Sequence, residues 1–528
     1  MPKIWKVFPK KSDDLKTQLL LNRGLKTPED IEKFFNPKIE NFQKEIEIPG
    51  IKKTWERIEK AIKNEELIVI FGDYDVDGIS ASAILYKALT SLKAKVLPYI
   101  PHREKEGYGL SKTGLDFARD SGASVVITVD NGIVAFEQAL YAKQIGLDLI
   151  ITDHHLPDKN LPEAYSLVHS VKMCGAGVAW CLIQDKVSKD LRNELLQFVV
   201  IATVCDLIPL KDLARAFLVE GLKVLNKTDN LGLKALFTEA GIENPITSYE
   251  VGHIIGPRIN AIGRLEHAIE ALRLLCTKDP HKAKKLAKLL SDTNLARQQL
   301  TMTAFEEAKL KVVKDSKIHI LHSETWNQGI IGLIAGRISE QYYRPAIAIS
   351  IGETISKGSA RSIDGINIVE VIRTSCQDIL IDIGGHSGAA GFSIQSDKIE
   401  EFKLRLEKSL ESLPEVEKTL EIEAEVESKK LTKSLVKLLE EFAPFGFGNP
   451  QIIFATNNMK VSDIRSVGNG KHLKFKADGI DAIAFGLGDL EKVLTTNQLI
   501  SLAYNLEINE FRGNQTLQLK VKDIHFNN

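Results

Sequence analysis

The feature that most constrains this chain is a series of short apolar runs, each leading into aspartate. Runs at 67–71, 125–129 and 149–151 precede Asp73-Tyr-Asp75-Val-Asp77-Gly78, Asp130-Asn-Gly and Asp153-His-His, and the apolar run 198–205 precedes Asp206. Because the carboxyl ends of successive parallel strands meet at one edge of an open sheet, these side chains are expected to converge there. So many carboxylates cannot gather without cations between them, so the pattern predicts a site for two divalent metals.

The order of apolar and amphipathic segments predicts an α/β protein with several domains. From residue 51 to 227, short strands alternate with helical patterns, as in βαβ units around a mostly parallel sheet. Residues 228–311 are mainly helical, and Pro280 opens a pattern for one long helix that connects two lobes. A smaller α/β lobe is expected over 312–415 and an all-β barrel over 416–528, with residues 1–50 as an N-terminal extension.

Composition and charge narrow the class of protein. The chain has 528 residues, 44% hydrophobic and 26% charged, which is ordinary for a globular protein, and its net charge of −1 argues against a strongly basic DNA-coating protein. The five cysteines show no metal-binding spacing, which indicates a reduced protein with buried thiols. No run approaches the roughly 20 apolar residues that span a bilayer, and the first residues lack a signal peptide, so we expect a cytoplasmic protein without a membrane.

The residue types favour hard divalent metals. Asp73, Asp75 and Asp77 would point into one cavity if their segment stays extended, although an acidic turn that caps a helix is an equal alternative for this segment alone. Of the two histidines after Asp153, one could bind metal and the other a phosphate oxygen. Oxygen-rich ligation with one histidine suits Mn²⁺ or Mg²⁺ better than Zn²⁺. Two such ions would activate water and stabilise charge on phosphorus, which indicates phosphodiester or phosphoanhydride hydrolysis.

In this order the four motifs resemble the DHH phosphoesterase superfamily, and further segments resemble its RecJ exonuclease family. These segments are Ile100–Arg103, Gly107–Gly109, Cys174–Ala179, Thr203–Leu210, Pro257–Leu265, Gly384–Gly391 and Pro444–Pro450. The resemblance covers roughly residues 50–528. It implies a DHH catalytic domain over 51–227, a helical connector over 228–311, a DHHA1 substrate-binding domain over 312–415 and an OB-fold domain over 416–528.

The resemblance also implies which residues carry the chemistry. The implied metal ligands are Asp75, Asp77, Asp130, His154 and Asp206. Asp73 is a further candidate ligand, because Phe71 stands where many relatives carry a metal-binding histidine. Asp130 and His155 are the catalytic candidates, with His155 in contact with the scissile phosphate.

Substrate-binding candidates lie mainly after the first lobe. Ser359 and Arg361 share one face of an extended segment and suit a terminal phosphate, and the resemblance adds Arg103 to a pocket for the 5′-phosphate. It also implies that Asn260 and Arg264 contact the strand near the metals, with Arg258 as another candidate beside the cleft. Gly384, Gly385 and His386 suit a tight loop whose amides approach an anion, although an ordinary glycine-rich loop remains an alternative.

Other features are less specific. In the last module, residues 471–476 interleave lysines with Phe475, which suits a stacking surface for a single strand and equally an ordinary amphipathic edge strand. Two residues depart from the family pattern: Asn327 stands where histidine is frequent, and Ala214 where asparagine is usual.

The leading hypothesis is a Mn²⁺- or Mg²⁺-dependent exonuclease that degrades single-stranded DNA from the 5′ end to mononucleotides. By the resemblance, it would act as a monomer in repair and recombination, with single-strand-binding protein and a helicase as partners. One alternative is a DHH phosphodiesterase for short oligoribonucleotides or small nucleotides. Another is a non-catalytic replication scaffold on a decayed version of the fold, which would be expected to lose ligands.

Overall fold

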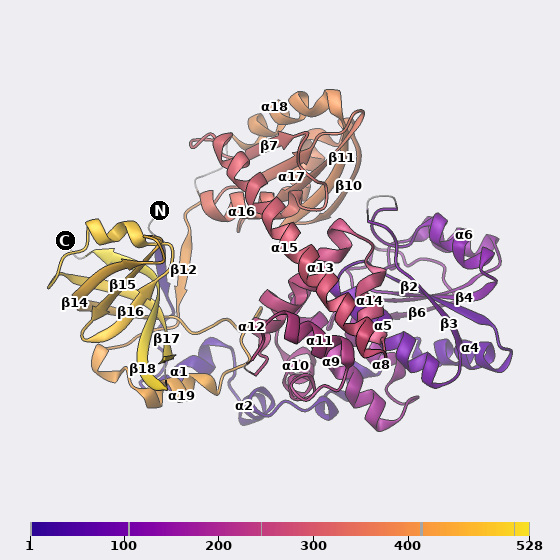
Figure 1. Cartoon of the computed structure of the whole chain (residues 1–528), viewed down its shortest axis with the longest axis horizontal. Coiled ribbons are helices and arrows are strands. Elements are labelled where there is room, and N and C mark those ends of the chain that lie inside the picture. Colours follow the sequence, from indigo (N-terminus) through magenta and orange to yellow (C-terminus); the bar gives the residue numbers. More distant parts are fainter. Residues whose placement is uncertain (1–2, 104–105, 244, 412–415, 512, 527–528) are drawn as a thin grey trace. The chain divides into compact units, whose positions relative to one another are not determined.

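The computed structural model describes residues 3–103, 106–243, 245–411, 416–511 and 513–526, which form two compact units. We call them the α/β unit, residues Ile39–Ile208 and Ala216–Val416, and the barrel unit, residues Met1–Lys38, Pro209–Arg215 and Glu417–Asn528. Figure 1 labels their helices and strands. No helix among the described residues is long and apolar enough to cross a membrane.

The first sheet of the α/β unit is entirely parallel, in the order β3-β2-β4-β5-β6 (Figure 1). Its strands are β2 (Leu67–Gly72), β3 (Lys95–Tyr99), β4 (Ala123–Val129), β5 (Asp148–Asp153) and β6 (Ser166–His169). Helices that pack against it include α4 (Ile51–Lys63), α5 (Val76–Ser91), α6 (Lys112–Asp120), α7 (Phe136–Gln144) and α8 (Gly175–Ile183). The central strands are buried apolar runs, as expected when helices cover both faces of a parallel sheet. The predicted parallel sheet is confirmed.

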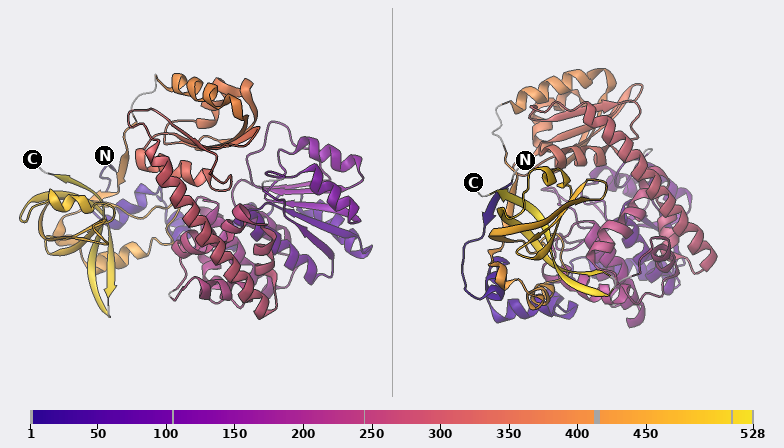
Figure 2. Two further views of the ribbon diagram at one scale, coloured as in Figure 1. Left: turned by 45° about the horizontal axis from the view of Figure 1, so that its top comes forward. Right: turned by 60° about the vertical axis from the view of Figure 1, so that its left-hand side comes forward.

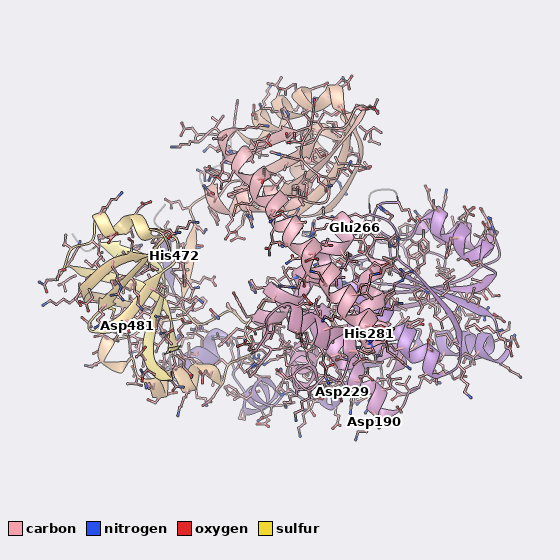
Figure 3. The ribbon with its side chains drawn as sticks, viewed as in Figure 1. Asp190, Asp229, Glu266, His281, His472 and Asp481 are labelled. Carbon is pink, nitrogen blue, oxygen red and sulfur yellow. The ribbon has the colours of Figure 1, made fainter. Side chains whose placement is uncertain are left out.

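A helical region follows this sheet. It contains α9 (Lys189–Cys205), α10 (Asp212–Leu225), α11 (Leu231–Glu239), α12 (Ser248–Glu250), a π-helix η2 (Val251–Ile255), α13 (Gly256–Leu265) and α14 (Ile269–Cys276). The predicted long helix is α15 (Pro280–Leu310), a single helix of 31 residues (Figure 2). Asp279 caps it by accepting from the backbone N–H groups of His281 and Lys282, at the end where Figure 3 labels His281.

The second sheet of the α/β unit is mixed, in the order β10-β11-β9-β8-β7, with only β7 and β8 parallel. Its strands are β7 (His319–Ser323), β8 (Ala346–Ser350), β9 (Ile355–Arg361), β10 (Leu380–His386) and β11 (Ala389–Gln395). One core joins the sheet to α16 (Ile331–Tyr342) and the end of α15, and another joins it to α17 (Ile368–Cys376) and α18 (Ile399–Leu410). The sheet is therefore covered by helices on both faces.

The barrel unit is built on a six-stranded sheet that closes through β14 and β17. Its strands are β13 (Ala424–Glu425), β14 (Phe454–Val467), β15 (His472–Ala477), β16 (Ile480–Ala484), β17 (Leu499–Phe511) and β18 (Asn514–Phe526), with α19 (Lys433–Glu440) beside them. The N-terminal residues belong to the same unit. β1 (Ile4–Val7) pairs with β12 (Thr419–Ile422), and Leu19 and Leu20 of α1 (Leu15–Asn22) enter the barrel core. The short α2 (Pro28–Phe35) starts with a capping box at Thr27 and Asp30.

Strand β15 alternates strictly between buried and outward-facing residues. Leu473, Phe475 and Ala477 are buried, and His472 and Lys474 between them reach the surface, where Figure 3 labels His472. A stacking role for Phe475 is therefore wrong, because its ring forms part of the core. Of the two interpretations of residues 471–476, the amphipathic strand holds, but its place at an edge is wrong, because β15 pairs with both β14 and β16.

Arg215 holds together distant segments of the barrel unit. Its guanidinium donates to the carbonyls of Phe34 (2.8 Å), Ala443 (2.7 Å), Phe442 (3.3 Å) and Pro444 (3.2 Å), and lies 3.8 Å from the centre of the Phe34 ring. Burial, with the charge of Arg23, lowers the pKa of Arg215 to about 10. Four carbonyl acceptors spread a buried charge that would otherwise be costly.

Candidate metal centre and strand-binding residues

The first acidic motif lies where β2 turns into α5. Asp75 caps this helix, because its Oδ1 accepts from the N–H groups of Asp77 (2.9 Å) and Gly78 (3.1 Å). The helix starts at Val76, so the prediction of an extended segment through Asp77 is wrong. Gly78 is required here, since a Cβ at this position would lie 2.6 Å from the backbone of Asp73.

The turn after β4 places the second motif. Asp130 has a left-handed backbone with φ of 63°, a conformation that costs free energy for a residue with a side chain and is frequent at functional sites. Asn131 holds this turn by donating to the carbonyls of Val129 (2.9 Å) and Phe71 (3.3 Å). A Cβ at Gly175 would lie 2.7 Å from that of Asp130, so glycine allows the start of α8 to approach the carboxylate.

Asp77 lies at the N-terminus of α8, where it accepts from the N–H groups of Gly175 (2.6 Å) and Ala176 (2.7 Å). A helix N-terminus stabilises a carboxylate, and these two bonds fix the orientation of this one. Burial and the nearby charge of Asp75 outweigh that stabilisation and raise the pKa of Asp77 to about 7. A cation would reverse this balance.

The four motifs meet around His154. Its Nε2 lies 3.0 Å from Asp130 Oδ1, 3.5 Å from Asp77 Oδ2 and 3.5 Å from Asp206 Oδ2. Asp206 reaches the cluster from the C-terminal end of α9. Three sets of possible ligands, whose donor atoms lie within 4.8 Å of one another, are Asp77-His154-Asp206, Asp73-Asp75-Asp130 and Asp130-His154-His155. All six predicted metal ligands therefore lie together, and we call these six residues the acidic cluster.

The acidic cluster fits hard divalent cations. Asp73 Oδ1, Asp130 Oδ1 and His154 Nε2 are buried and have no hydrogen-bond partner within the described part of the chain. Buried polar atoms rarely remain unsatisfied, so these three indicate an absent partner. Burial, followed by repulsion between carboxylates, raises the pKa of Asp206 to about 8 and those of Asp73 and Asp130 well above the ordinary range. Oxygen ligands with one imidazole suit Mn²⁺ or Mg²⁺.

Arginines lie near the acidic cluster on other elements. Arg361 in β9 donates to Ser359 Oγ (3.2 Å), and Arg264 at the end of α13 donates to the carbonyl of Gly329 (2.9 Å). Arg103 stacks over Tyr74, with 4.8 Å to the ring centre. Burial, together with the charges of Arg103, Arg297 and Arg361, lowers the pKa of Arg264 to about 9. Among the described residues, Arg264 and Arg361 donate to neutral oxygens and form no ion pair, so this side of the site has the opposite charge to the acidic cluster.

Comparison with known proteins decides the family. Three family models match: the DHH family, N-terminal domain, at residues 67–203, the DHHA1 domain at 315–412 and the RecJ OB domain at 422–523. The chain is 34% identical over 532 residues to the single-stranded-DNA-specific exonuclease RecJ of Bacillus subtilis, covering 96% of this chain and 67% of that protein. It is 32% identical to the exonuclease RecJ of Haemophilus influenzae, covering 89% of this chain and 90% of that protein. The chain belongs to the RecJ family.

Solved structures of RecJ proteins are similar over the whole fold. A crystal structure of RecJ in complex with Mn²⁺ from Thermus thermophilus covers 99% of this chain and 80% of its own, with a TM-score of 0.88 and 26% identity. A crystal structure of an exonuclease RecJ bound to manganese covers 70% of this chain and 96% of its own, with a TM-score of 0.63 and 32% identity. The two α/β lobes, the long helix and the OB-like barrel predicted from the sequence are thus confirmed.

In this RecJ family member, Asp153 organises the acidic cluster without belonging to its ligand sets. Its carboxylate accepts from the N–H groups of Ile133 (2.9 Å) and His154 (2.7 Å) and lies 2.7 Å from His155 Nδ1. Burial alone would raise the pKa of Asp153, but the bond to His155 and the backbone donors lower it. Burial likewise opposes protonation of His155, yet Asp153 and its neighbours raise the pKa of His155 to about 9.

Tyr108 completes this chain of contacts, because its hydroxyl lies 3.0 Å from His155 Nε2. The sequence predicted His155 as a phosphate contact but did not assign roles to Asp153 and Tyr108. The Gly107-Tyr108-Gly109 segment was the available signal for Tyr108. The three side chains fix where the imidazole of His155 lies.

The remaining predicted substrate residues differ in their surroundings. Asn260 accepts from the N–H of Val76 (3.1 Å) at the start of α5, which ties α13 to the acidic cluster. Arg258 donates to the carbonyl of Ile254 (2.8 Å), and no contact with the acidic cluster is recorded for it among the described residues. Asn327, a departure from the family pattern, accepts from the N–H of Gly329 (2.7 Å), next to the carbonyl that Arg264 contacts.

Gly384, Gly385 and His386 do not form the predicted tight loop. They are exposed residues of strand β10 that pair with β11, and the turn of this hairpin is at 387–388. Gly385 has φ of 140°, and a Cβ there would lie 2.3 Å from the carbonyl oxygen of Ala389. The glycines therefore allow two backbones to approach one another, and an anion-binding role for this hairpin remains a proposal.

Proposed function

We propose that this RecJ family member hydrolyses single-stranded DNA from its 5′ end and releases 5′-mononucleotides. The observation that carries the proposal is the acidic cluster itself, in which every predicted ligand retains a carboxylate or imidazole and three buried atoms have no hydrogen-bond partner among the described residues. A scaffold that had lost activity would be expected to lose such ligands. The relatives named single-stranded-DNA-specific exonuclease support the choice of substrate.

We assign two ions, Mn²⁺ or Mg²⁺, to Asp75, Asp77, Asp130, His154 and Asp206, with Asp73 as a further ligand. When bound, such ions supply an activated water and neutralise charge on the phosphate. The protein orients these ligands through the N-terminus of α8 and the capping turn at Asp75. Asp153 holds the Nδ1 side of His155, and His155 Nε2, which lies 3.0 Å from the Tyr108 hydroxyl, is the nitrogen that would donate to an oxygen of the scissile phosphate in place of that hydroxyl.

We assign the 5′-to-3′ direction of cleavage to a pocket that would bind the 5′-terminal phosphate and is formed by Arg103, Ser359 and Arg361. The contact between Arg361 and Ser359 places a guanidinium and a hydroxyl side by side, a suitable arrangement for charge-assisted bonds to phosphate oxygens. Arg264 and Asn260, on the helix next to the start of α5, would contact the strand near the metals. Arg258 and the Gly384–His386 strand are assigned to more distant contacts.

We also propose the bounds of the domains along the chain. The catalytic domain spans 51–227, the connector 228–311, the DHHA1 domain 312–415 and the OB domain 416–528, and the matched family segments fall inside these bounds. We further propose that the protein acts in the cytoplasm as a monomer in repair and recombination. Its protein partners would then be a helicase and single-strand-binding protein.

The test is a time course with purified protein, Mn²⁺ and a single strand labelled at either its 5′ or its 3′ end, beside the matched duplex. We expect the 5′ label to appear first as a mononucleotide, the 3′ label to shorten gradually, and the blunt duplex to remain intact. Release only from the 3′ end would overturn the proposal. Cleavage of dinucleotides alone would instead support a phosphodiesterase for short oligonucleotides.

A further inference from the structure

A small cavity lies beside the acidic cluster, among the end of α9, α13, α15 and α16. It has a volume of about 150 Å³, and its lining includes Cys205, Asn260, Arg264, Arg297 and Leu333. Cys205 directly precedes Asp206, so the cavity begins one residue from a predicted metal ligand. None of its lining residues is acidic. The cavity therefore has the opposite charge to the cluster next to it.

The backbone around the cavity is unusual. Gly252 belongs to the π-helix η2, and Gly256 follows it as the first residue of α13. Single π-helical turns are rare and occur mostly at functional sites. A Cβ at Gly256 would lie 2.3 Å from the sulfur of Cys205, so glycine is required where the π-helix meets α9. Glycine therefore allows the π-helix and α9 to lie close together, and this contact forms one wall of the cavity.

Arg297 is the lining residue without an assigned function. Its Nη2 donates to Asn294 Oδ1 (2.8 Å), but its Nε is buried and has no hydrogen-bond partner among the described residues. Burial, with the charge of Arg337, lowers the pKa of Arg297. Neither Arg297 nor Arg264 forms an ion pair in the part of the chain that the structure describes. Partly buried guanidinium groups without a carboxylate carry a desolvation cost, and an anion would remove that cost.

The size of the cavity restricts this anion. Pockets that enclose drug-sized ligands usually have volumes of about 300–1,000 Å³. A cavity of about 150 Å³ is too small to enclose a nucleoside but has room for a phosphate group. Two guanidinium groups present planar sets of N–H donors that match phosphate oxygens. A phosphodiester group is thus the ligand that both the size and the charge favour.

We propose that this cavity binds one internucleotide phosphate of the DNA strand, with Arg297 and Arg264 as its ligands. The inference rests on the proposed function and adds a third phosphate position, separate from the 5′-terminal pocket and from the scissile phosphate. Release of mononucleotides from the 5′ end leaves no internucleotide linkage on the 5′ side of the scissile bond, so the bound phosphate belongs to a linkage beyond it. Because Cys205 adjoins Asp206, this linkage is one of the first. Contacts to phosphate alone read no base, so this position strengthens binding equally for every sequence.

The test is a scan of single methylphosphonate linkages, each of which removes the charge of one phosphate. Binding is measured in the inactive Asp130→Asn background, with Arg297 intact, with Arg297→Met, with Arg297→Lys and with Arg273→Met. Arg273 is an exposed arginine of α14 outside the cavity and serves as the matched control. Melting temperatures of all variants show that each one folds.

With Arg297 intact, we expect one internal linkage whose neutralisation weakens binding about tenfold, the size typical of a single phosphate or base contact. In Arg297→Met this penalty disappears, and the salt dependence of binding falls by about one ion. Arg297→Lys keeps part of the penalty, and Arg273→Met keeps all of it. If the Arg297→Met protein keeps the full penalty at that linkage, the inference is overturned. If Arg297→Met does not fold, Arg297→Lys is read in its place: a reduced penalty supports the inference, and the full penalty overturns it.

Failure of this inference is distinguishable from failure of the proposed function. In the first case, the wild-type protein still releases mononucleotides from the 5′ end, but no methylphosphonate penalty depends on Arg297. In the second case, the wild-type protein releases none. The cleavage assay is therefore run alongside the binding scan.

Discussion

The acidic cluster carries an excess of negative charge, whereas the arginines near it carry an excess of positive charge. In the cluster, burial and then repulsion between neighbouring carboxylates raise the pKa of Asp77 to about 7 and that of Asp206 to about 8. Around Arg264, burial and neighbouring guanidinium groups lower the pKa of an arginine to about 9. Both regions belong to the α/β unit, yet among the described residues no ion pair joins one of these arginines to a carboxylate of the acidic cluster.

This difference teaches which ligands the unit is built for. Proteins usually pair buried charges, because an isolated buried ion costs several kcal/mol. The carboxylates of the acidic cluster suit divalent metals, and the arginines suit a phosphate backbone. A phosphate backbone bound together with divalent metals would therefore balance the charges of both regions. Each of the following predictions tests one side of this comparison.

The largest effect is expected from Asp130→Asn. The substitution keeps the shape of the side chain but removes a charge from the centre of the acidic cluster, so cleavage should fall by at least about 10³-fold. Strand binding should remain within a few-fold, because the arginines are unchanged. Cleavage rates and fluorescence anisotropy are compared with Asp185→Asn, a substitution of an exposed aspartate in the same unit. Loss of binding with retained cleavage would contradict the metal role.

The second prediction concerns pH and metal. Asp77 and Asp206 have folded-state pKa values above the ordinary value of about 4, so the metal-free protein gains the most stability from these two groups below that value. Its stability should decrease as pH rises towards 8, by at least about 3 °C in melting temperature. Mn²⁺ requires the deprotonated ligands and should reverse this trend. A metal-free melting temperature that rises from pH 5 to pH 8 would contradict the crowding of carboxylates.

The arginine side is tested by Arg361→Gln. The loss of one charged hydrogen-bond donor should reduce the preference for 5′-phosphorylated over 5′-hydroxyl ends by about tenfold. The ratio of kcat/KM for the two ends measures this effect. Arg373→Gln changes an exposed arginine on α17 in the same lobe and should leave the ratio unaltered. An unchanged ratio in Arg361→Gln would exclude the assigned 5′-phosphate pocket.

The smallest effect is expected from Tyr108→Phe. It removes only the hydroxyl next to His155 Nε2 and should lower kcat about two- to fivefold, because Asp153 still holds the ring through Nδ1. KM should change little, since the ring remains. Tyr141→Phe removes a hydroxyl that contacts Asp116 on the surface and serves as control. Equal rates for both variants would mean that Tyr108 does not position His155.

The sequence predicts the parallel sheet and the gathering of the acidic motifs, because apolar strands that end in aspartate can meet at only one edge. It does not predict the local geometry. The N-cap at Asp75 begins α5 at Val76, one residue before Asp77, and the Asp77 carboxylate is placed by backbone donors of α8, which are distant in sequence. Nor does it predict the burial of Phe475 or the four carbonyls around Arg215, since both depend on tertiary packing.

The most direct test of the central claim is a crystal soaked in Mn²⁺ and measured at the manganese absorption edge. The account predicts two anomalous peaks, both within coordination distance of Asp75, Asp77, Asp130, His154 and Asp206. It also predicts that Asp130→Asn crystals lose at least one of the peaks. Absence of any peak at these residues in the wild-type protein, under conditions in which it cleaves DNA, would contradict the account.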